Sequence, residues 1–365
     1  MKFPFAPVAF LIFGICSGLF IGAVEATSTR SWRRVLSSRV SQLGLRAGGS
    51  FDAALTFKRV QKTCPQPAVN DAGQQMTEMA QAASAAMDDL VNDRPNGKAQ
   101  SMYNSVFGQE NDADLRKGYY KIVKDVFDSI AAFTNSGSDW SLYCDESWAT
   151  YHPFSKTEED EDGKTKIGYW MAKDPTEFSR DQHFEGGISG VCSAGTLAWT
   201  LHGPNVIQLC PMLFNKGVAG IISSNVPVTI PQDQSYGEKE KRIDQMNTMA
   251  STFLHEMAHQ VKDTIDDLPA IRNDGTEAGT TLKDKVGNIL ALGFRNTSMF
   301  ALPFFRSLRD ALLTLWTSIE SYGWKYVYNL GRFRTPSARQ NADSYMNFAI
   351  GVYYTGNDWS TGVSR

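Results

Sequence analysis

Residues 253–260 read Phe253-Leu254-His255-Glu256-Met257-Ala258-His259-Gln260, which contains the pattern H-E-x-x-H. On a helix this spacing places two imidazoles one turn apart on one face, so both can bind one Zn²⁺ while Glu256 reaches a metal-bound water. The whole chain contains only 5 histidines. A chance match somewhere in such a sequence has a probability of about 0.3%. The stretch therefore predicts a catalytic zinc site.

The residues around this motif predict a helix over 242–262. Apolar residues at helical spacing form a stripe on one side, and a second set that includes both motif histidines lies roughly opposite. The stripe consists of Met246, Ala250, Phe253 and Met257, and the opposite set of Thr248, Thr252, His255 and His259. We expect the helix to pack its apolar side on a core and to turn its histidines into a cleft. The alternative is a pair of histidines that are merely satisfied inside a core.

A catalytic zinc takes three protein ligands and a water, so the motif needs one more residue. No H-x-x-G-x-x-H extension follows His259. Further along the chain stand T-I-D-D-L at 264–268, the pair Tyr322-Gly323, and N-A-D-S-Y at 341–345. Cys-Pro at 210–211 follows the apolar run Val206–Leu209.

Over about residues 185–355 these motifs resemble the aspzincin metalloendopeptidases, the deuterolysin and peptidyl-Lys metallopeptidase group of secreted fungal enzymes. In that family H-E-x-x-H is followed by G-T-x-D, a Tyr-Gly pair and a helix that opens with N-A-D-x-Y. The present chain has T-I-D-D-L in place of G-T-x-D, and its Tyr-Gly pair stands much further along the chain. The segment 269–320 therefore looks like an insertion relative to the family pattern.

The resemblance implies a role for each matching residue. His255 and His259 would be zinc ligands and Glu256 the general base. Asp267 would be the third ligand, and Tyr322 would hydrogen-bond the developing oxyanion.

Three other acids remain open as the third ligand. Asp266 is adjacent to Asp267, and Glu320 lies just before the Tyr-Gly pair. Asp343 is favoured instead as an N-terminal helix residue, where the helix dipole stabilises a carboxylate.

The composition is that of a folded globular protein, with 42% hydrophobic, 21% charged and 12% aromatic residues. These values argue against wholesale disorder and coiled coil. With 36 Lys+Arg and 39 Asp+Glu the net charge is -3, so no global charge points to nucleic acid or to an anionic membrane. We expect a monomer that acts on protein or peptide substrates.

The N-terminus predicts export. Lys2 precedes an uncharged run from Val8 to Val24, which is shorter than the roughly 20 residues of a transmembrane helix. A cleavable signal peptide over residues 1–26 is the interpretation, with a secreted, extracellular protein that keeps no stable membrane association. Residues 27–62 are basic and form either a pro-segment trimmed after export or a solvated lead-in.

The cysteines agree with export. Removal of Cys16 with the signal peptide leaves four cysteines, an even number in a chain bound for an oxidising compartment. Two disulfides are expected, and the pairing Cys192–Cys210 with Cys64–Cys144 is favoured because short loops close cheaply. Buried free thiols are the alternative.

The fold class predicted for residues 63–365 is α+β with a zincin-like arrangement. Apolar spacing predicts helices over 72–136, short apolar runs predict strands over 137–235, and the chain is helical again from Glu238. The expected domain thus has a helical N-terminal part, a small twisted sheet, the motif helix and C-terminal helices. Asn296 opens the sole glycosylation sequon, inside the predicted insertion.

The resulting functional hypothesis is a secreted zinc-dependent endopeptidase. In this mechanism Zn²⁺ lowers the pKa of its water and polarises the scissile carbonyl, Glu256 moves the proton, and Tyr322 stabilises the oxyanion. The alternative is a secreted zinc-binding protein or surface antigen that keeps the scaffold without proteolysis. The departure from G-T-x-D favours this alternative, whereas the intact Glu256 opposes it.

Overall fold

The structure is a computed structural model. It describes residues 50–133, 137–152, 169–172, 184–185, 192, 196–202, 205–214, 226–233, 240–262, 264–277 and 323–364. Two predicted segments lie largely outside the described residues. One is the N-terminal part up to residue 49, with the predicted signal peptide and most of the lead-in. The other is residues 278–322, which include most of the predicted insertion 269–320. The described residues belong to one compact unit that begins at Ser50.

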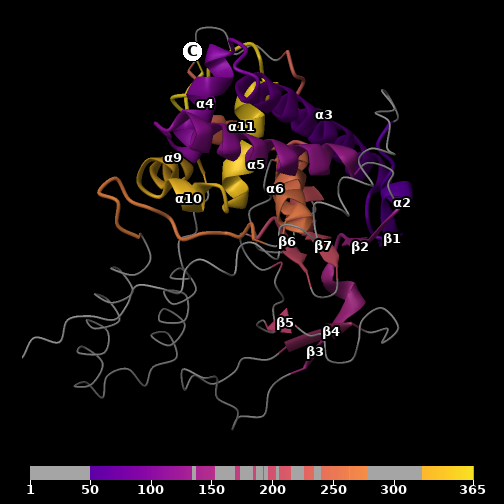
Figure 1. Cartoon of the computed structure of the whole chain (residues 1–365). Helices are drawn as coiled ribbons and strands as arrows, with labels where there is room; N and C mark the ends of the chain where they lie inside the picture. Colours follow the sequence, from indigo (N-terminus) through magenta and orange to yellow (C-terminus); the bar gives the residue numbers. More distant parts are fainter. Residues whose placement is uncertain are drawn as a thin grey trace, which may run out of the picture. The chain divides into compact units, whose positions relative to one another are not determined.

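The described elements are helices and short strands (Figure 1). The helices are α2 (Ala53–Thr56), α3 (Gln66–Val91), α4 (Gly97–Phe107), α5 (Ala113–Ala132), α6 (Met249–Val261), α9 (Trp324–Phe333), α10 (Thr335–Ala338) and α11 (Ala342–Tyr353). Short 3₁₀ turns are η1 (Glu146–Trp148), η2 (Pro211–Phe214) and η3 (Ile243–Met246). The strands are β1 (Phe57–Val60), β2 (Ser138–Tyr143), β3 (Ala149–His152), β4 (Tyr169–Ala172), β5 (Phe184–Glu185), β6 (Ala198–Leu201) and β7 (Val206–Leu209). The mixed α+β class agrees with the sequence prediction.

The larger sheet has the strand order β1-β2-β7-β6. Strands β1, β2 and β7 are parallel, and β6 runs antiparallel to β7. All four residues of β7 are buried. They include the polar Gln208, whose Oε1 accepts a hydrogen bond from the Trp148 indole N–H at 2.8 Å. Strand β6 lies at the edge of this sheet and contacts the motif helix α6. The smaller sheet is antiparallel, in the order β3-β4-β5.

Strand β1 comes from the basic segment that the sequence analysis placed before the domain. Phe51 and Phe57 are each only 3% exposed and belong to the core, whereas Lys58 and Arg59 face solvent. The basic residues of this strand therefore lie on its solvent-facing side, while Phe57 belongs to the core. The folded unit starts at Ser50, so the expected boundary between residues 62 and 63 falls inside it.

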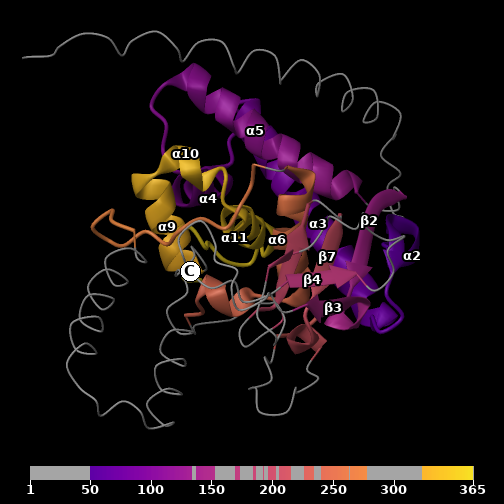
Figure 2. The same ribbon diagram turned by 90° about the horizontal axis from the view of Figure 1, so that it is seen from below.

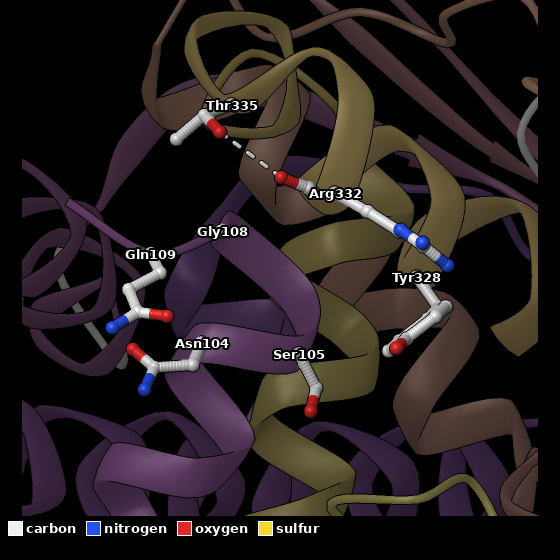
Figure 3. Close-up of a pocket in the computed structure, with 8 residues that line it drawn as sticks. Asn104, Ser105, Gly108, Gln109, Tyr328, Arg332 and Thr335 are labelled. Atoms are coloured by element: carbon white, nitrogen blue, oxygen red, sulfur yellow. Dashed lines mark hydrogen bonds between the residues drawn. The ribbon is translucent and has the colours of Figure 1, made fainter. Parts of the chain in front are cut away.

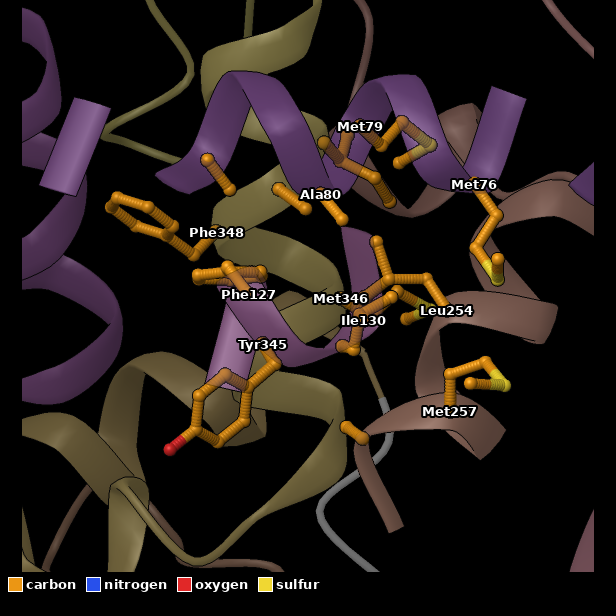
Figure 4. Close-up of a cluster of buried hydrophobic side chains, with 14 of the residues drawn as sticks. Met76, Met79, Ala80, Phe127, Ile130, Leu254, Met257, Tyr345, Met346 and Phe348 are labelled. Atoms are coloured by element: carbon orange, nitrogen blue, oxygen red, sulfur yellow. The ribbon is translucent and has the colours of Figure 1, made fainter. Parts of the chain in front are cut away.

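Helix α11 occupies the middle of the helical part. It packs against α3, α4 and α6 (Figure 2). Aromatic, methionine and aliphatic side chains of four helices meet there (Figure 4). The side chains are Met76, Met79 and Ala80 of α3, Phe127 and Ile130 of α5, Leu254 and Met257 of α6, and Tyr345, Met346 and Phe348 of α11. Burying one large apolar side chain stabilises the fold by about 1.5–3 kcal/mol, so this core holds α6 firmly against α11.

The motif helix is shorter than the predicted range 242–262. Its first residue is Met249, and the preceding residues form the separate turn η3. The Thr248 hydroxyl accepts a hydrogen bond from the Ser251 backbone N–H at 3.0 Å, and the Ser251 hydroxyl accepts one from the Thr248 N–H at 2.8 Å. This reciprocal capping box starts the helix. Thr248 is thus a buried cap rather than a member of the histidine face.

The structure contains the two disulfides that the sequence analysis favoured. Cys64–Cys144 links the turn before α3 to the end of β2, and Cys192–Cys210 links the segment before β6 to the end of β7. Both bridges therefore fasten the larger sheet. None of the helices in the described ranges combines the length and apolar character needed to cross a membrane.

We expect the four cysteines at 64, 144, 192 and 210 to show no free thiol in the exported protein, because each is bonded to a partner. Alkylation of the denatured, unreduced protein followed by peptide mass spectrometry should leave their peptides unlabelled. Reduction before alkylation should label all four. Labelling of these peptides without reduction would refute the pairing.

Candidate metal centre

Helix α6 places both motif histidines in the interior. His255 is 5% exposed and His259 is 8% exposed. Their Nε2 atoms are 3.2 Å apart, as expected for residues one helical turn apart. The apolar residues of the same helix, such as Phe253 and Met257, are fully buried in the core behind them. The helix therefore has its apolar side on the core, as predicted, but its histidines are almost closed off from solvent.

Asp267 completes a group of three side chains. Its Oδ1 lies 3.1 Å from His255 Nε2 and 3.5 Å from His259 Nε2. One ligand atom from each of the three residues lies within 4.8 Å of the other two, so the group could hold a metal ion. Of the three candidate acids that the structure describes, Asp266, Asp267 and Asp343, only Asp267 lies close to both Nε2 atoms.

The backbone after α6 decides which of two adjacent aspartates turns inward. Asp266 pairs with the chain before α11, since its N–H donates to the Gln340 carbonyl at 2.8 Å and its carbonyl accepts from the Ala342 N–H at 3.2 Å. Its exposed side chain accepts a hydrogen bond from the Asp267 N–H at 2.8 Å. The Leu268 N–H donates to Asn341 Oδ1 at 3.2 Å. Held on both sides, Asp267 directs its carboxylate to the histidines.

Asp343 contacts the group of three through the Nδ1 atom of His255. It is the second residue of α11 and is 2% exposed. Its Oδ1 lies 3.1 Å from His255 Nδ1, and its Oδ2 accepts the Gly323 N–H at 2.7 Å. Sequence analysis expected an N-terminal helix residue here, and it missed the contact with His255. No local pattern pointed to that contact, because the two residues come from different helices.

The donor set fits a zinc ion. His259 Nδ1 lies 2.9 Å from the Ile265 carbonyl oxygen, which can only accept a hydrogen bond, so we assign the ring proton to Nδ1. His255 Nδ1 lies against the Asp343 carboxylate, which accepts a hydrogen bond, so we assign the ring proton of His255 to Nδ1 as well. Both Nε2 atoms face the Asp267 carboxylate. A protonated Nε2 donates a hydrogen bond to this carboxylate, and a deprotonated Nε2 offers its lone pair to a metal ion. Two imidazole nitrogens and one carboxylate, with the rings oriented through Nδ1, are the ligand types that catalytic zinc sites use.

The Asp267 carboxylate and the two imidazoles stabilise each other's charged forms. Burial alone would raise the pKa of Asp267, but hydrogen bonds to His255 and His259 lower it far below its ordinary value. Burial alone would lower the pKa of each histidine, and the hydrogen bond to the Asp267 carboxylate outweighs it, so that both pKa values are raised. Asp267 is therefore ionised at any physiological pH, as a metal ligand must be.

Glu256 lies between the two histidines in the motif and is 4% exposed. Its Oε2 accepts a hydrogen bond from the Thr200 hydroxyl of β6 at 2.7 Å. Burial raises the pKa of Glu256, against the opposing effects of His255, His259 and the Thr200 hydrogen bond. A carboxylate with a raised pKa accepts and returns protons more readily near neutral pH. Thr200 is a site residue that sequence reasoning missed, because it belongs to a distant strand.

Two candidates from the sequence analysis cannot be placed. Tyr322 and Glu320 lie outside the described residues, which resume at Gly323. Their roles therefore stay predictions. His152 and His202 belong to other parts of the chain, and neither is a member of the metal group.

A polar pocket of about 400 Å³ lies where α4 meets α9 and α10 (Figure 3). It is lined by Asn104, Ser105, Gly108, Gln109, Tyr328, Gly331, Arg332 and Thr335. Gly108 has a φ of 84°, and a Cβ atom on it would lie 2.3 Å from the Gly331 carbonyl oxygen. Only glycine permits this close approach of the two helices. The pocket contains no residue of the metal group.

Comparisons with known proteins give little further evidence. No family model matches the chain, and no curated protein matches it. Among solved structures, the chain is similar to a zinc peptidase from Grifola frondosa with 13% identity and a TM-score of 0.30. The match covers 76% of this chain and 94% of the other. A superposition of this quality supports no inference about fold or function, so membership of the aspzincin family stays a prediction.

Proposed function

We propose that the protein is a secreted zinc-dependent endopeptidase. The observation that carries the proposal is the convergence of His255 Nε2, His259 Nε2 and Asp267 Oδ1, with Glu256 on the same helix. Glu256 is a buried carboxylate outside the group of three. Zinc storage does not need such a residue, whereas peptide hydrolysis needs a general base. The two disulfides support export to an oxidising compartment.

When bound, zinc would supply a Lewis acid that polarises the scissile carbonyl and a lowered pKa for a water molecule. His255, His259 and Asp267 would hold the ion. Glu256 would take the proton of the attacking water and return it to the leaving amine. The Thr200 hydroxyl would hold the Glu256 carboxylate in place. Tyr322, as the family resemblance implies, would hydrogen-bond the oxyanion.

The test is metal content together with casein hydrolysis of the purified protein. We expect about one zinc per chain, loss of nearly all hydrolysis in 1,10-phenanthroline, and recovery when zinc is returned, because water activation depends on the ion. The isomer 1,7-phenanthroline, which does not chelate, is the matched control and should leave activity intact.

Two outcomes would contradict the proposal in different ways. Hydrolysis that persists after the metal is removed would exclude a metallopeptidase. Stoichiometric zinc with no hydrolysis of casein or of a mixed peptide library would favour the zinc-binding protein instead.

A further inference from the structure

The polar pocket between α4 and the α9–α10 segment has no part in the metal centre (Figure 3). Its volume of about 400 Å³ falls within the range of about 300–1,000 Å³ that small-molecule sites occupy. The described residues that line it include no aliphatic side chain and no acid. An apolar ligand would therefore find little surface to bury, and a cation would find no counter-charge.

Two glycines fix the separation of the pocket's walls. A Cβ atom on Gly108 would lie 2.3 Å from the Gly331 carbonyl oxygen, and one on Gly331 would lie 2.6 Å from the Val106 carbonyl oxygen. A side chain at either position would push α4 away from α9. The walls are thus held by direct backbone contact, so a ligand does not have to bring them together.

The α4 side of the pocket offers both donors and acceptors. Asn104 Oδ1 accepts a hydrogen bond from Gln100 Nε2 at 2.8 Å, which among the described residues leaves the Asn104 amide N–H groups for a ligand. The Ser105 hydroxyl donates to the Ser360 carbonyl at 2.7 Å, so its oxygen remains an acceptor. The exposed Gln109 amide adds one group of each kind. Ligand hydroxyls, which both donate and accept, match such a surface.

The α9 side adds a cation and an aromatic ring. Arg332 lies exposed in the last turn of α9, and none of the ion pairs among the described residues includes it. Its guanidinium carbon lies 5.1 Å from the centroid of the Phe333 ring, a contact that leaves the N–H edge free. Tyr328, one turn earlier, is 38% exposed, and its ring centroid lies 6.2 Å from that of Trp324. This side therefore presents a positive charge next to an exposed ring.

These groups together match a sugar acid. A carboxylate fits the two parallel N–H bonds of a guanidinium. A pyranose ring carries hydroxyls for the polar groups of α4, and its apolar C–H face can lie on the Tyr328 ring. A phosphate ion would also pair with Arg332, but it leaves the aromatic ring without a partner.

We propose that this pocket binds a hexuronic acid, either as the free sugar acid or as a unit of an acidic polysaccharide. Its carboxylate would pair with Arg332, its ring would lie against Tyr328, and its hydroxyls would face Asn104 and Gln109. Figure 3 shows these two amides on one side of the pocket and Tyr328 and Arg332 on the other. The proposal does not depend on the peptidase function, because no residue of the metal group lines the pocket.

The experiment is a ligand-observed NMR titration of the full chain with matched probes. Methyl β-D-glucuronide carries ring and carboxylate, methyl β-D-glucoside lacks the carboxylate, and acetate lacks the ring. The glucuronide should bind about tenfold more tightly than either of the others, as expected for charge-assisted hydrogen bonds that only it combines with the ring contact. A glucuronic acid trisaccharide distinguishes the sources. Tighter binding of the trisaccharide would identify a polysaccharide, and equal binding would identify the free sugar acid.

Variants at two exposed positions test the assignment of groups. Arg332→Met should remove the preference for the glucuronide while glucoside binding stays the same, and Tyr328→Leu should weaken both. Arg334→Met is the matched control, because this exposed arginine lies 3.4 Å from Glu277 and outside the pocket. The proposal is overturned if the glucuronide does not bind, if acetate binds as tightly, or if Arg332→Met keeps the preference.

Discussion

Glu256→Gln should bind about one zinc per chain and yet hydrolyse casein roughly 10²–10⁴-fold more slowly, the range typical of a lost general base. The three atoms that could bind a metal ion belong to other residues, so the substitution leaves them in place. The amide oxygen of glutamine can still accept the Thr200 hydrogen bond, which keeps the helix and strand together. The amide has no basic lone pair for the water proton. Metal analysis and initial rates on the same preparation measure the two effects separately.

Glu277→Gln is a suitable control for that experiment. It makes the same chemical change at a partly exposed acid, which lies 3.4 Å from Arg334, and should keep nearly full activity. Normal turnover by Glu256→Gln would eliminate the peptidase mechanism. Loss of zinc in this variant would instead give Glu256 a structural role in the site.

Asp267→Ala should lower zinc affinity far more than alanine substitution of any neighbouring acid. It removes a carboxylate that lies 3.1 Å from His255 Nε2 and brings negative charge directly to the ion. Asp343→Ala should weaken zinc by ~10–100-fold, because Asp343 acts on the metal only through His255. Asp266→Ala should have the smallest effect of the three, since this side chain is exposed and accepts a hydrogen bond from the Asp267 backbone N–H rather than facing the histidines.

Competitive titration against a chromophoric zinc chelator ranks these variants, and Glu320→Ala should be measured with them. We expect the order Asp267, Asp343, Asp266, with Glu320 having little effect. If Glu320→Ala empties the site while Asp267→Ala does not, the third ligand lies beside Tyr322. The alignment of T-I-D-D-L with the family pattern would then be wrong.

Local geometry explains the parts of the site that could be predicted from the sequence. His255 and His259 share a helix face because of their spacing, and Glu256 lies between them for the same reason. Strand β7 was predictable because three of its four residues, Val206, Ile207 and Leu209, are apolar. The start of α6 was not, since residues before and after Thr248 have similar apolar spacing. A side-chain cap, rather than periodicity, starts the helix there.

Composition was misleading where one strand has two different sides. Residues 57–60 read as part of a basic lead-in, yet Phe57 inserts into the core and β1 pairs with β2. The partner strand begins at Ser138, far along the chain, so no local pattern indicates the pairing.

The sequence by itself determined a helix with two histidines and a glutamate on it, four cysteines suited to two disulfides, and a mixed α+β class. The family resemblance favoured Asp267 over Asp266, but only the tertiary structure shows how the Asp267 carboxylate comes within 3.1 Å of His255 Nε2. Both are aspartates in the same loop. The difference depends on two backbone hydrogen bonds, one donated by the Asp266 N–H to the Gln340 carbonyl and one accepted by the Asp266 carbonyl from the Ala342 N–H. The contacts of Asp343 with His255 and of Thr200 with Glu256 likewise join distant segments. Such contacts arise from packing of the whole core, which local residue patterns do not encode.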